Sequence, residues 1–335
     1  MKSCQPYQLN KGVMTAPYNM NGIFFMNHRF MNYFLTYLKG IAMGAADVVP
    51  GVSGGTIAFI TGIYDTLLGS IRRINPSLFG LWQREGFKAV LNHINVGFLI
   101  ALFGGILTSI LTLAKLISWL LITHPIPLWS FFFGLILISV VHIMKQVEQK
   151  KIIQLLFLIA GITLAYSITI LQPLDMQPTT FNLIFAGAIA ICAMILPGIS
   201  GSFILLLLGI YPTILLAVKE LNLGILSLFA IGAICGLLSF SHLLSWLLQR
   251  HRDTTLIFLT GLMIGTLPKI WPWKETLSWR INSHGEQVPL LQHNLLPNQF
   301  ENIVGQPSNL LLAILCMFGG IGIVWLLEKV AQKNQ

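Results

Sequence analysis

Two short segments of this 335-residue chain carry the same combination of proline, glycine and hydroxyl side chains. They read Pro50-Gly51-Val52-Ser53-Gly54-Gly55-Thr56 and Pro197-Gly198-Ile199-Ser200-Gly201-Ser202. Proline and glycine interrupt a helix, and the half-helix that follows presents unpaired backbone N–H groups, hydroxyl donors and the positive end of its dipole. We therefore predict that an oxyanion or a phosphate head group binds at Ser53, Gly54, Gly55, Thr56, Ser200, Gly201 and Ser202.

The residues that open the two segments are predicted hinges, namely Pro50, Gly51, Pro197 and Gly198. A purely structural helix break would also use proline and glycine, and this alternative stays open. It explains less well why the pattern occurs twice. Residues 50–68 align without gaps on residues 197–215, and ten of the nineteen positions are identical.

The composition excludes a water-soluble enzyme or binding module. Hydrophobic residues make up 55% of the chain and charged residues 9%, and the mean hydropathy is +0.77. A soluble domain contains about 25% charged residues. The apolar stretches are long and continuous, so we predict an all-α polytopic protein of a plasma membrane.

The formal net charge of +9 does not indicate a nucleic-acid partner, because the basic residues are spread between the apolar stretches. They are better explained as determinants of membrane topology. The four cysteines form no Cys-x-x-Cys pair. We therefore expect neither a metal site nor a disulfide framework. No cofactor is expected.

Six apolar stretches are predicted membrane spans: 94–122, 128–144, 152–171, 224–248, 255–270 and 309–328. Two others, 34–71 and 181–218, contain the Pro-Gly segments. As one helix, 34–71 would be about 57 Å long against a hydrocarbon core of about 30 Å, so each is predicted to be a re-entrant hairpin of two half-helices. Fifteen of the twenty Lys and Arg residues then share one face, which predicts cytoplasmic termini and an extracytoplasmic 271–308 loop.

The two hairpins begin two copies of one repeat. After a polar leader, 1–32, which could form an amphipathic helix, repeat 1 covers 33–144 and repeat 2 covers 181–270. The span 152–171 links them and the span 309–328 ends the chain. Three crossings separate the starts of the copies, so the second copy is predicted to be inverted, an arrangement typical of secondary transporters with alternating access.

Five charged residues flank the first segment and are candidates for a coupling, gating or head-group role: Lys39, Asp47, Asp65, Arg72 and Arg73. Charge within a membrane is costly and by default functional. Asp47 could equally pair with Lys39 or cap a helix end. Arg72 and Arg73 could attract a phosphate, or they could be anchors that extend to the membrane surface.

The residues from Lys39 to Thr56, with Gly62-Ile63-Tyr64, resemble the leading signature of the bacterial polyprenyl-phosphate transporters. Ile195 to Ser202, with Gly209-Ile210-Tyr211, resembles their second signature, and the likeness covers about 33–330. It implies a translocase of the bacterial plasma membrane. That translocase returns undecaprenyl phosphate, the carrier lipid of peptidoglycan and other envelope polymers, from the outer to the cytoplasmic leaflet. Ser202 and Phe203 stand where the first signature has Gly55 and Thr56, so equal roles for the two halves are not implied.

Two other classes of function stay open. A small-anion transporter or channel could use the same half-helix ends. A membrane phosphatase acting on the pyrophosphorylated carrier would need a nucleophile or base beside the phosphate, and no paired catalytic acids occur near the segments. We therefore expect a transporter and not an enzyme. The expected partners are the polyprenyl phosphate lipid and the bilayer, and a homo-oligomer is left open.

Overall fold

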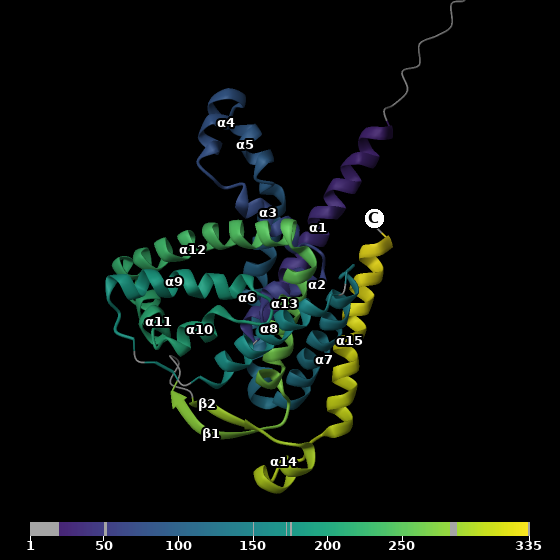
Figure 1. The fold of residues 1–335 in the computed structure, drawn as a ribbon, viewed down its shortest axis with the longest axis vertical. Coiled ribbons are helices and arrows are strands. Elements are labelled where there is room, and N and C mark those ends of the chain that lie inside the picture. The colour runs from purple at the N-terminus through teal and green to yellow at the C-terminus, as the bar shows by residue number, and fades with distance from the viewer. Residues whose placement is uncertain are drawn as a thin grey trace, which may run out of the picture.

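The computed structural model describes residues 20–49, 52–149, 151–171, 173–174, 176–281 and 287–333. The predicted hinge residues Pro50 and Gly51, and residues 1–19 of the predicted leader, lie outside this part of the chain. The described chain is mostly helical (Figure 1). Its elements are α1 (Met20–Val48), α2 (Gly54–Ile60), α3 (Tyr64–Arg72), α4 (Ser77–Glu85), α5 (Phe87–His93), α6 (Val96–Thr123), α7 (Pro125–Lys145), α8 (Ile152–Ile170), α9 (Thr180–Ile195), α10 (Gly201–Leu207), α11 (Tyr211–Lys219), α12 (Leu223–Arg250), α13 (Arg252–Thr266), η1 (Leu267–Ile270), β1 (Lys274–Ile281), β2 (Gln287–Asn294), α14 (Pro297–Val304) and α15 (Leu310–Lys333).

Four of the described helices, α6, α7, α8 and α12, are long and apolar enough to cross a membrane. A fifth candidate is the pair α10–α11, which is bent by 112° at its break. Of the other two predicted spans, 255–270 is divided between α13 and η1, and 309–328 corresponds to the 24-residue helix α15.

Each region predicted to be a re-entrant hairpin contains two helix breaks, whereas the prediction has one. The first arm of 34–71 is the 29-residue helix α1, longer than a half-helix, because no proline interrupts residues 20–48. Each second arm divides into two short helices, α2 with α3 and α10 with α11. Gly62 and Gly209 stand at these additional breaks with φ of +71° and +76°, a region that favours glycine.

The long helices pack in four pairs: α1 with α6, α9 with α12, α7 with α15 and α8 with α13. In every pair a glycine of each helix lies directly against a backbone carbonyl of the other. In α1 and α6, for example, a Cβ on Gly40 would lie 2.2 Å from the oxygen of Leu102, and one on Gly105 would lie 2.1 Å from that of Tyr37. The other three pairs meet at Gly187 and Gly232, at Gly134 and Gly320, and at Gly161 and Gly261.

The predicted loop 271–308 is a folded unit that an all-α prediction does not include. β1 and β2 pair antiparallel, and α14 follows them. β1 contains Thr276, Trp279 and Ile281, residue types that favour strands. The indole N–H groups of Trp271 and Trp273 donate to the carbonyls of Leu295 and Ser308, both at 2.8 Å, which fastens the unit together.

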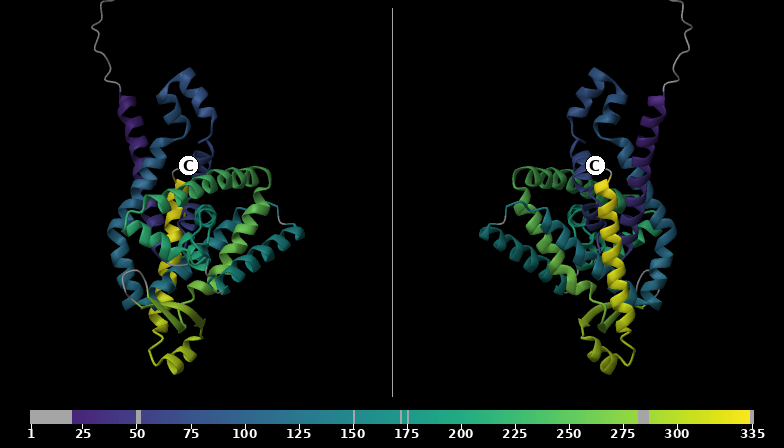
Figure 2. Two further views of the ribbon diagram at one scale, coloured as in Figure 1. Left: turned by 90° about the vertical axis from the view of Figure 1, so that its left-hand side faces the viewer. Right: turned by 90° about the vertical axis from the view of Figure 1, so that its right-hand side faces the viewer.

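The elements divide between two ends of the molecule. In Figure 1 the C-terminal end of α15 and the pair α4–α5 lie at one end, and β1, β2 and α14 lie at the other. The side views of Figure 2 agree. The two motifs are carried between these ends by the short helices α2 and α10 (Figure 1).

Candidate functional site

The first motif is closed by its own side chains. Ser53 is the N-cap of α2, and its hydroxyl oxygen accepts a hydrogen bond from the N–H of Gly55 at 3.1 Å. The N–H of Gly54 donates to a carboxylate oxygen of Asp47 at 2.7 Å. Asp47 therefore caps a helix end in this structure. The donors expected to reach an anion here are paired with groups of the protein.

The first motif also lies directly against the second. Thr56 is fully buried, and its hydroxyl oxygen accepts a hydrogen bond from the N–H of Gly198 at 3.0 Å. The Ser53 hydroxyl lies 3.2 Å from the carbonyls of both Met194 and Leu196. Further hydrogen-bonding capacity of the first motif is thus used to hold the chain that leads into the second.

The glycines of both motifs serve this close contact. A Cβ on Gly54 would lie 2.5 Å from the Asp47 carboxylate, and one on Gly55 would lie 2.6 Å from the carbonyl of Ile195. In the second motif, a Cβ on Gly201 would lie 2.6 Å from the carbonyl of Ala190. Larger side chains at these positions would disturb the packing.

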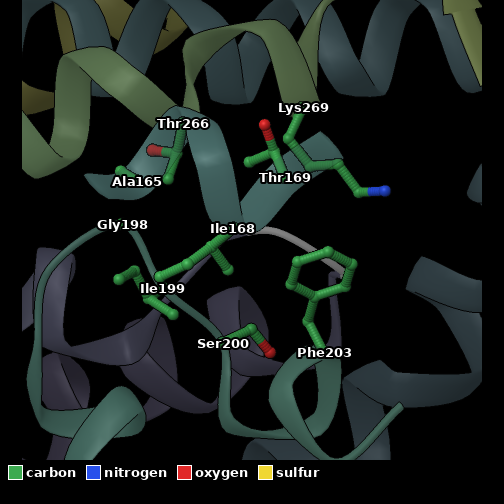
Figure 3. Close-up of a pocket in the computed structure, with 9 residues that line it drawn as sticks. All are labelled: Ala165, Ile168, Thr169, Gly198, Ile199, Ser200, Phe203, Thr266 and Lys269. Atoms are coloured by element: carbon green, nitrogen blue, oxygen red, sulfur yellow. The ribbon is translucent and has the colours of Figure 1, made fainter. Parts of the chain in front are cut away.

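The second motif is different because it lines a small pocket that is partly open to its surroundings (Figure 3). The pocket lies between the motif, the C-terminal end of α8, the end of α13 and η1. Of the predicted site residues it brings together Gly198 and Ser200. The complete lining is Ala165, Ile168, Thr169, Gly198, Ile199, Ser200, Phe203, Thr266 and Lys269.

Two serine hydroxyls and a lysine lie at or next to this pocket, whose surface is apolar. The hydroxyls of Ser200 and Ser202 lie 2.9 Å apart and share one hydrogen bond, so one of their two hydrogens can be donated elsewhere. The Nζ of Lys269 lies 4.7 Å from the centre of the Phe203 ring. The residue aligned with Asp47 in the second motif is Met194, so the acidic cap of α2 has no counterpart on α10.

The folded unit after η1 contacts the backbone of Lys269. The ammonium of Lys274, at the start of β1, donates to the backbone carbonyl of Lys269 and lies 4.7 Å from the centre of the Trp129 ring. Burial, together with the nearby charge of Lys269, lowers the pKa of Lys274 from 10.5 to about 7. The amide of Asn294 donates to the carbonyl of Pro268 at 2.8 Å, which fixes η1 a second time.

The remaining predicted charges lie away from the pocket lining. The Lys39 ammonium donates to the carbonyl of Thr61 at 2.8 Å, so it does not pair with Asp47 in this structure. Asp65 forms an exposed ion pair with Arg252 at 3.2 Å. Arg72 and Arg73 form hydrogen bonds with other helices. Arg72 donates to Ser245 and Gln249 of α12, and Arg73 donates to the carbonyl of His93 at the end of α5.

Three polar lining residues, Thr169, Thr266 and Lys269, are not predicted as site residues from the sequence, and Phe203 is noted there only as a departure from the first motif. Thr169 and Lys269 lie outside both motifs, and their spacing carries no signal that they meet. From the sequence, Lys269 is one of the basic residues explained as determinants of membrane topology. Among the residues that the structure describes, no group of three or more His, Cys, Asp or Glu side chains could hold a metal ion.

Comparisons with known proteins give a consistent result. A model of the undecaprenyl phosphate translocase-like family matches residues 43–288. A polyprenyl-phosphate transporter of Vibrio cholerae serotype O1 is 68% identical over 92% of this chain and 100% of that protein. One of Staphylococcus aureus is 34% identical over 72% of this chain and 87% of that protein. No solved structure matches the chain. The chain therefore belongs to the undecaprenyl phosphate translocase-like family.

Proposed function

We propose that this protein carries undecaprenyl phosphate from the outer to the cytoplasmic leaflet of the bacterial plasma membrane. The names of the two relatives support a polyprenyl phosphate as the substrate. The observation that carries the proposal is the pocket at the second motif, where hydroxyls and a lysine lie beside apolar side chains. Returning the carrier in this direction would supply envelope polymer synthesis with recycled lipid.

The substrate sets the physical problem. A phosphate head group cannot enter the hydrocarbon core without large desolvation cost, whereas the polyprenyl chain can remain in lipid throughout. A transporter needs only to replace the water around the head group and can leave the tail outside. A small pocket with few donors is sufficient for that task.

The second motif would supply these donors. The hydrogen that Ser200 and Ser202 leave unused would be donated to a phosphate oxygen, and Lys269 would contribute its charge. Phe203, which holds the Lys269 ammonium over its ring, would exchange this contact for the phosphate. The first motif, closed by Asp47 and bonded to Gly198, would support the site from the opposite side in this conformation.

Transport would follow from two inverted repeats that rock against each other. The matched motifs, the paired breaks at Gly62 and Gly209 and the four glycine-mediated helix pairs support this architecture. The pocket lies beside η1, which leads into the 271–308 unit, so with that unit outside the cell the site would be poised to receive the head group from the outer leaflet. The contact between Asp47 and α2 would act as the gate that changes when the site turns inward.

Sealed liposomes containing undecaprenyl phosphate in both leaflets would test the function. An external phosphate-reactive probe reaches inner-leaflet lipid only after translocation, so we expect faster loss of that pool with the protein than in protein-free liposomes. Release of inorganic phosphate would instead identify a phosphatase. Anion flux without movement of the lipid would identify a small-anion transporter or channel, and either outcome would contradict the proposal.

A further inference from the structure

A helical hairpin, α4 and α5, projects from the body between α3 and α6. Neither helix contains a buried residue. Figure 1 places the hairpin at the end of the molecule opposite β1, β2 and α14. In the second half of the chain only residues 220–222 separate α11 from α12, so the hairpin is an addition to the repeated body and takes no part in the pocket.

The hairpin exposes three large aromatic side chains. Phe79 is 60% exposed, Trp82 54% and Phe87 65%. The rings of Phe79 and Trp82 lie edge to face, with centroids 6.0 Å apart, and form a single apolar surface. Leaving this aromatic surface in water forfeits the free energy of burial, so it favours contact with an apolar partner.

The charge around these rings indicates what that partner is. Residues 72–93 contain four basic residues and one acidic residue, Glu85. Arg84 and Lys88 are exposed on the hairpin itself, while Arg73 fastens its base through the carbonyl of His93 at 3.0 Å. Exposed aromatics combined with a net positive charge complement an anionic lipid surface.

The position of the hairpin along the membrane normal fits the same partner. α6 begins at Val96, three residues after α5 ends at His93. Its 28 residues extend about 42 Å, comparable with the roughly 40–45 Å of a bilayer including its head groups. The amino-terminal end of α6 therefore reaches the head-group level, and the hairpin starts there.

We propose that α4 and α5 form an interfacial anchor that inserts Phe79, Trp82 and Phe87 into the boundary between head groups and acyl chains of an anionic leaflet. Arg84 and Lys88 would contact the lipid phosphates. The anchor would hold the segment between α3 and α6 against the membrane. This inference is independent of the transported substrate.

The full-length protein in nanodiscs tests this directly. Lipids brominated close to the head group quench nearby tryptophan, and the difference between wild type and Trp82→Phe isolates one of the eight tryptophans. We expect phosphatidylglycerol-containing nanodiscs to quench most of this difference signal. Replacing both cations, Arg84→Gln with Lys88→Gln, should weaken the quenching while the protein stays folded, as judged by thermal unfolding.

Trp119 is the matched control, because it is 51% exposed on the spanning helix α6. The fluorescence difference between wild type and Trp119→Phe should be quenched by lipids brominated at one of several positions along the acyl chain. This quenching should be the same in neutral and anionic nanodiscs. Quenching of Trp119 without quenching of Trp82 in any lipid would show that the hairpin stands clear of the bilayer. Equal Trp82 quenching in neutral and anionic nanodiscs would overturn the assignment to an anionic surface.

Discussion

Single side chains account for the difference between the two motifs. Thr56 in the first motif uses its hydroxyl to hold Gly198, whereas Phe203 at the aligned position of the second motif faces Lys269. Met194 replaces Asp47 in the same way. These two exchanges remove an acceptor and a carboxylate from the second motif, and they place Phe203 against Lys269.

Ser200→Ala should slow translocation while leaving the fold intact. The variant removes one of the two hydroxyls that the site would offer to the phosphate. A hydrogen bond of about 1 kcal/mol corresponds to a roughly fivefold loss of affinity, and one to a charged group to more. Initial rates at limiting lipid should fall by at least this factor, measured with the phosphate-reactive probe.

Ser130→Ala is the control for that variant, since Ser130 is equally a buried serine in α7 and takes no part in the pocket lining. Its translocation rate should equal that of wild type. A wild-type translocation rate for Ser200→Ala would contradict a phosphate site at the second motif.

Thr56→Val should reduce stability. It keeps the shape of the side chain but leaves the buried N–H of Gly198 without its acceptor, a cost of about 1–3 kcal/mol. Thermal unfolding in detergent should show a lower midpoint for Thr56→Val than for Thr56→Ser, which retains the hydroxyl. Equal midpoints would mean that this contact between the motifs carries no stability.

The elements show where sequence reasoning reaches its limit. Both Pro-Gly segments and the four long spans could be predicted, because each depends on local residue preferences or on apolar length. The breaks at Gly62 and Gly209 were missed, although glycine within a helical pattern is a signal for them. The contacts of Lys269 with Phe203 and of Asp47 with Gly54 depend on tertiary packing, which no spacing encodes.

Asp47→Asn tests the gate formed at α2. The amide oxygen can still accept the hydrogen bond from Gly54, so the helix cap and the folded state should survive. If the carboxylate charge is part of the gate, translocation should fall several-fold while the thermal midpoint changes little. Wild-type translocation by Asp47→Asn would limit Asp47 to a capping role.

The unit formed by β1, β2 and α14 should become more stable with rising pH through Lys274. The pKa of Lys274 is about 7 in the folded protein and 10.5 ordinarily, so between these values unfolding takes up a proton. Stability therefore rises with pH across this range, and it falls as pH decreases toward 7. Hydrogen exchange of residues 287–294 at different pH, corrected for intrinsic exchange, would measure this.

Lys274→Met provides the comparison, because methionine is of similar length and does not titrate. The gain in protection between pH 7 and pH 9 should be larger for wild type than for the variant. An identical pH dependence in both would show that Lys274 is not the group responsible.

At the scale of the whole molecule, helix pairs form a scaffold around two motifs that differ in sequence and in their contacts. Four glycine-mediated helix pairs form the scaffold, and the two motifs meet within it. In the proposed transport cycle, the inverted repeats would permit the same motion in both directions, while one motif would bind the head group and the other would control access. A transport measurement can test whether the two motifs have these different roles.

The most direct test compares Lys269→Gln with Lys115→Gln in sealed liposomes containing undecaprenyl phosphate. Lys269 lines the pocket, whereas Lys115 is exposed on α6, so the two variants lose the same charge at different places. Losing a charge-assisted hydrogen bond costs about 1.5–3 kcal/mol. We predict that Lys269→Gln slows exposure of inner-leaflet phosphate at least tenfold and that Lys115→Gln retains the wild-type rate. Equal rates for both variants, with both proteins folded, would contradict a lipid phosphate site at the second motif.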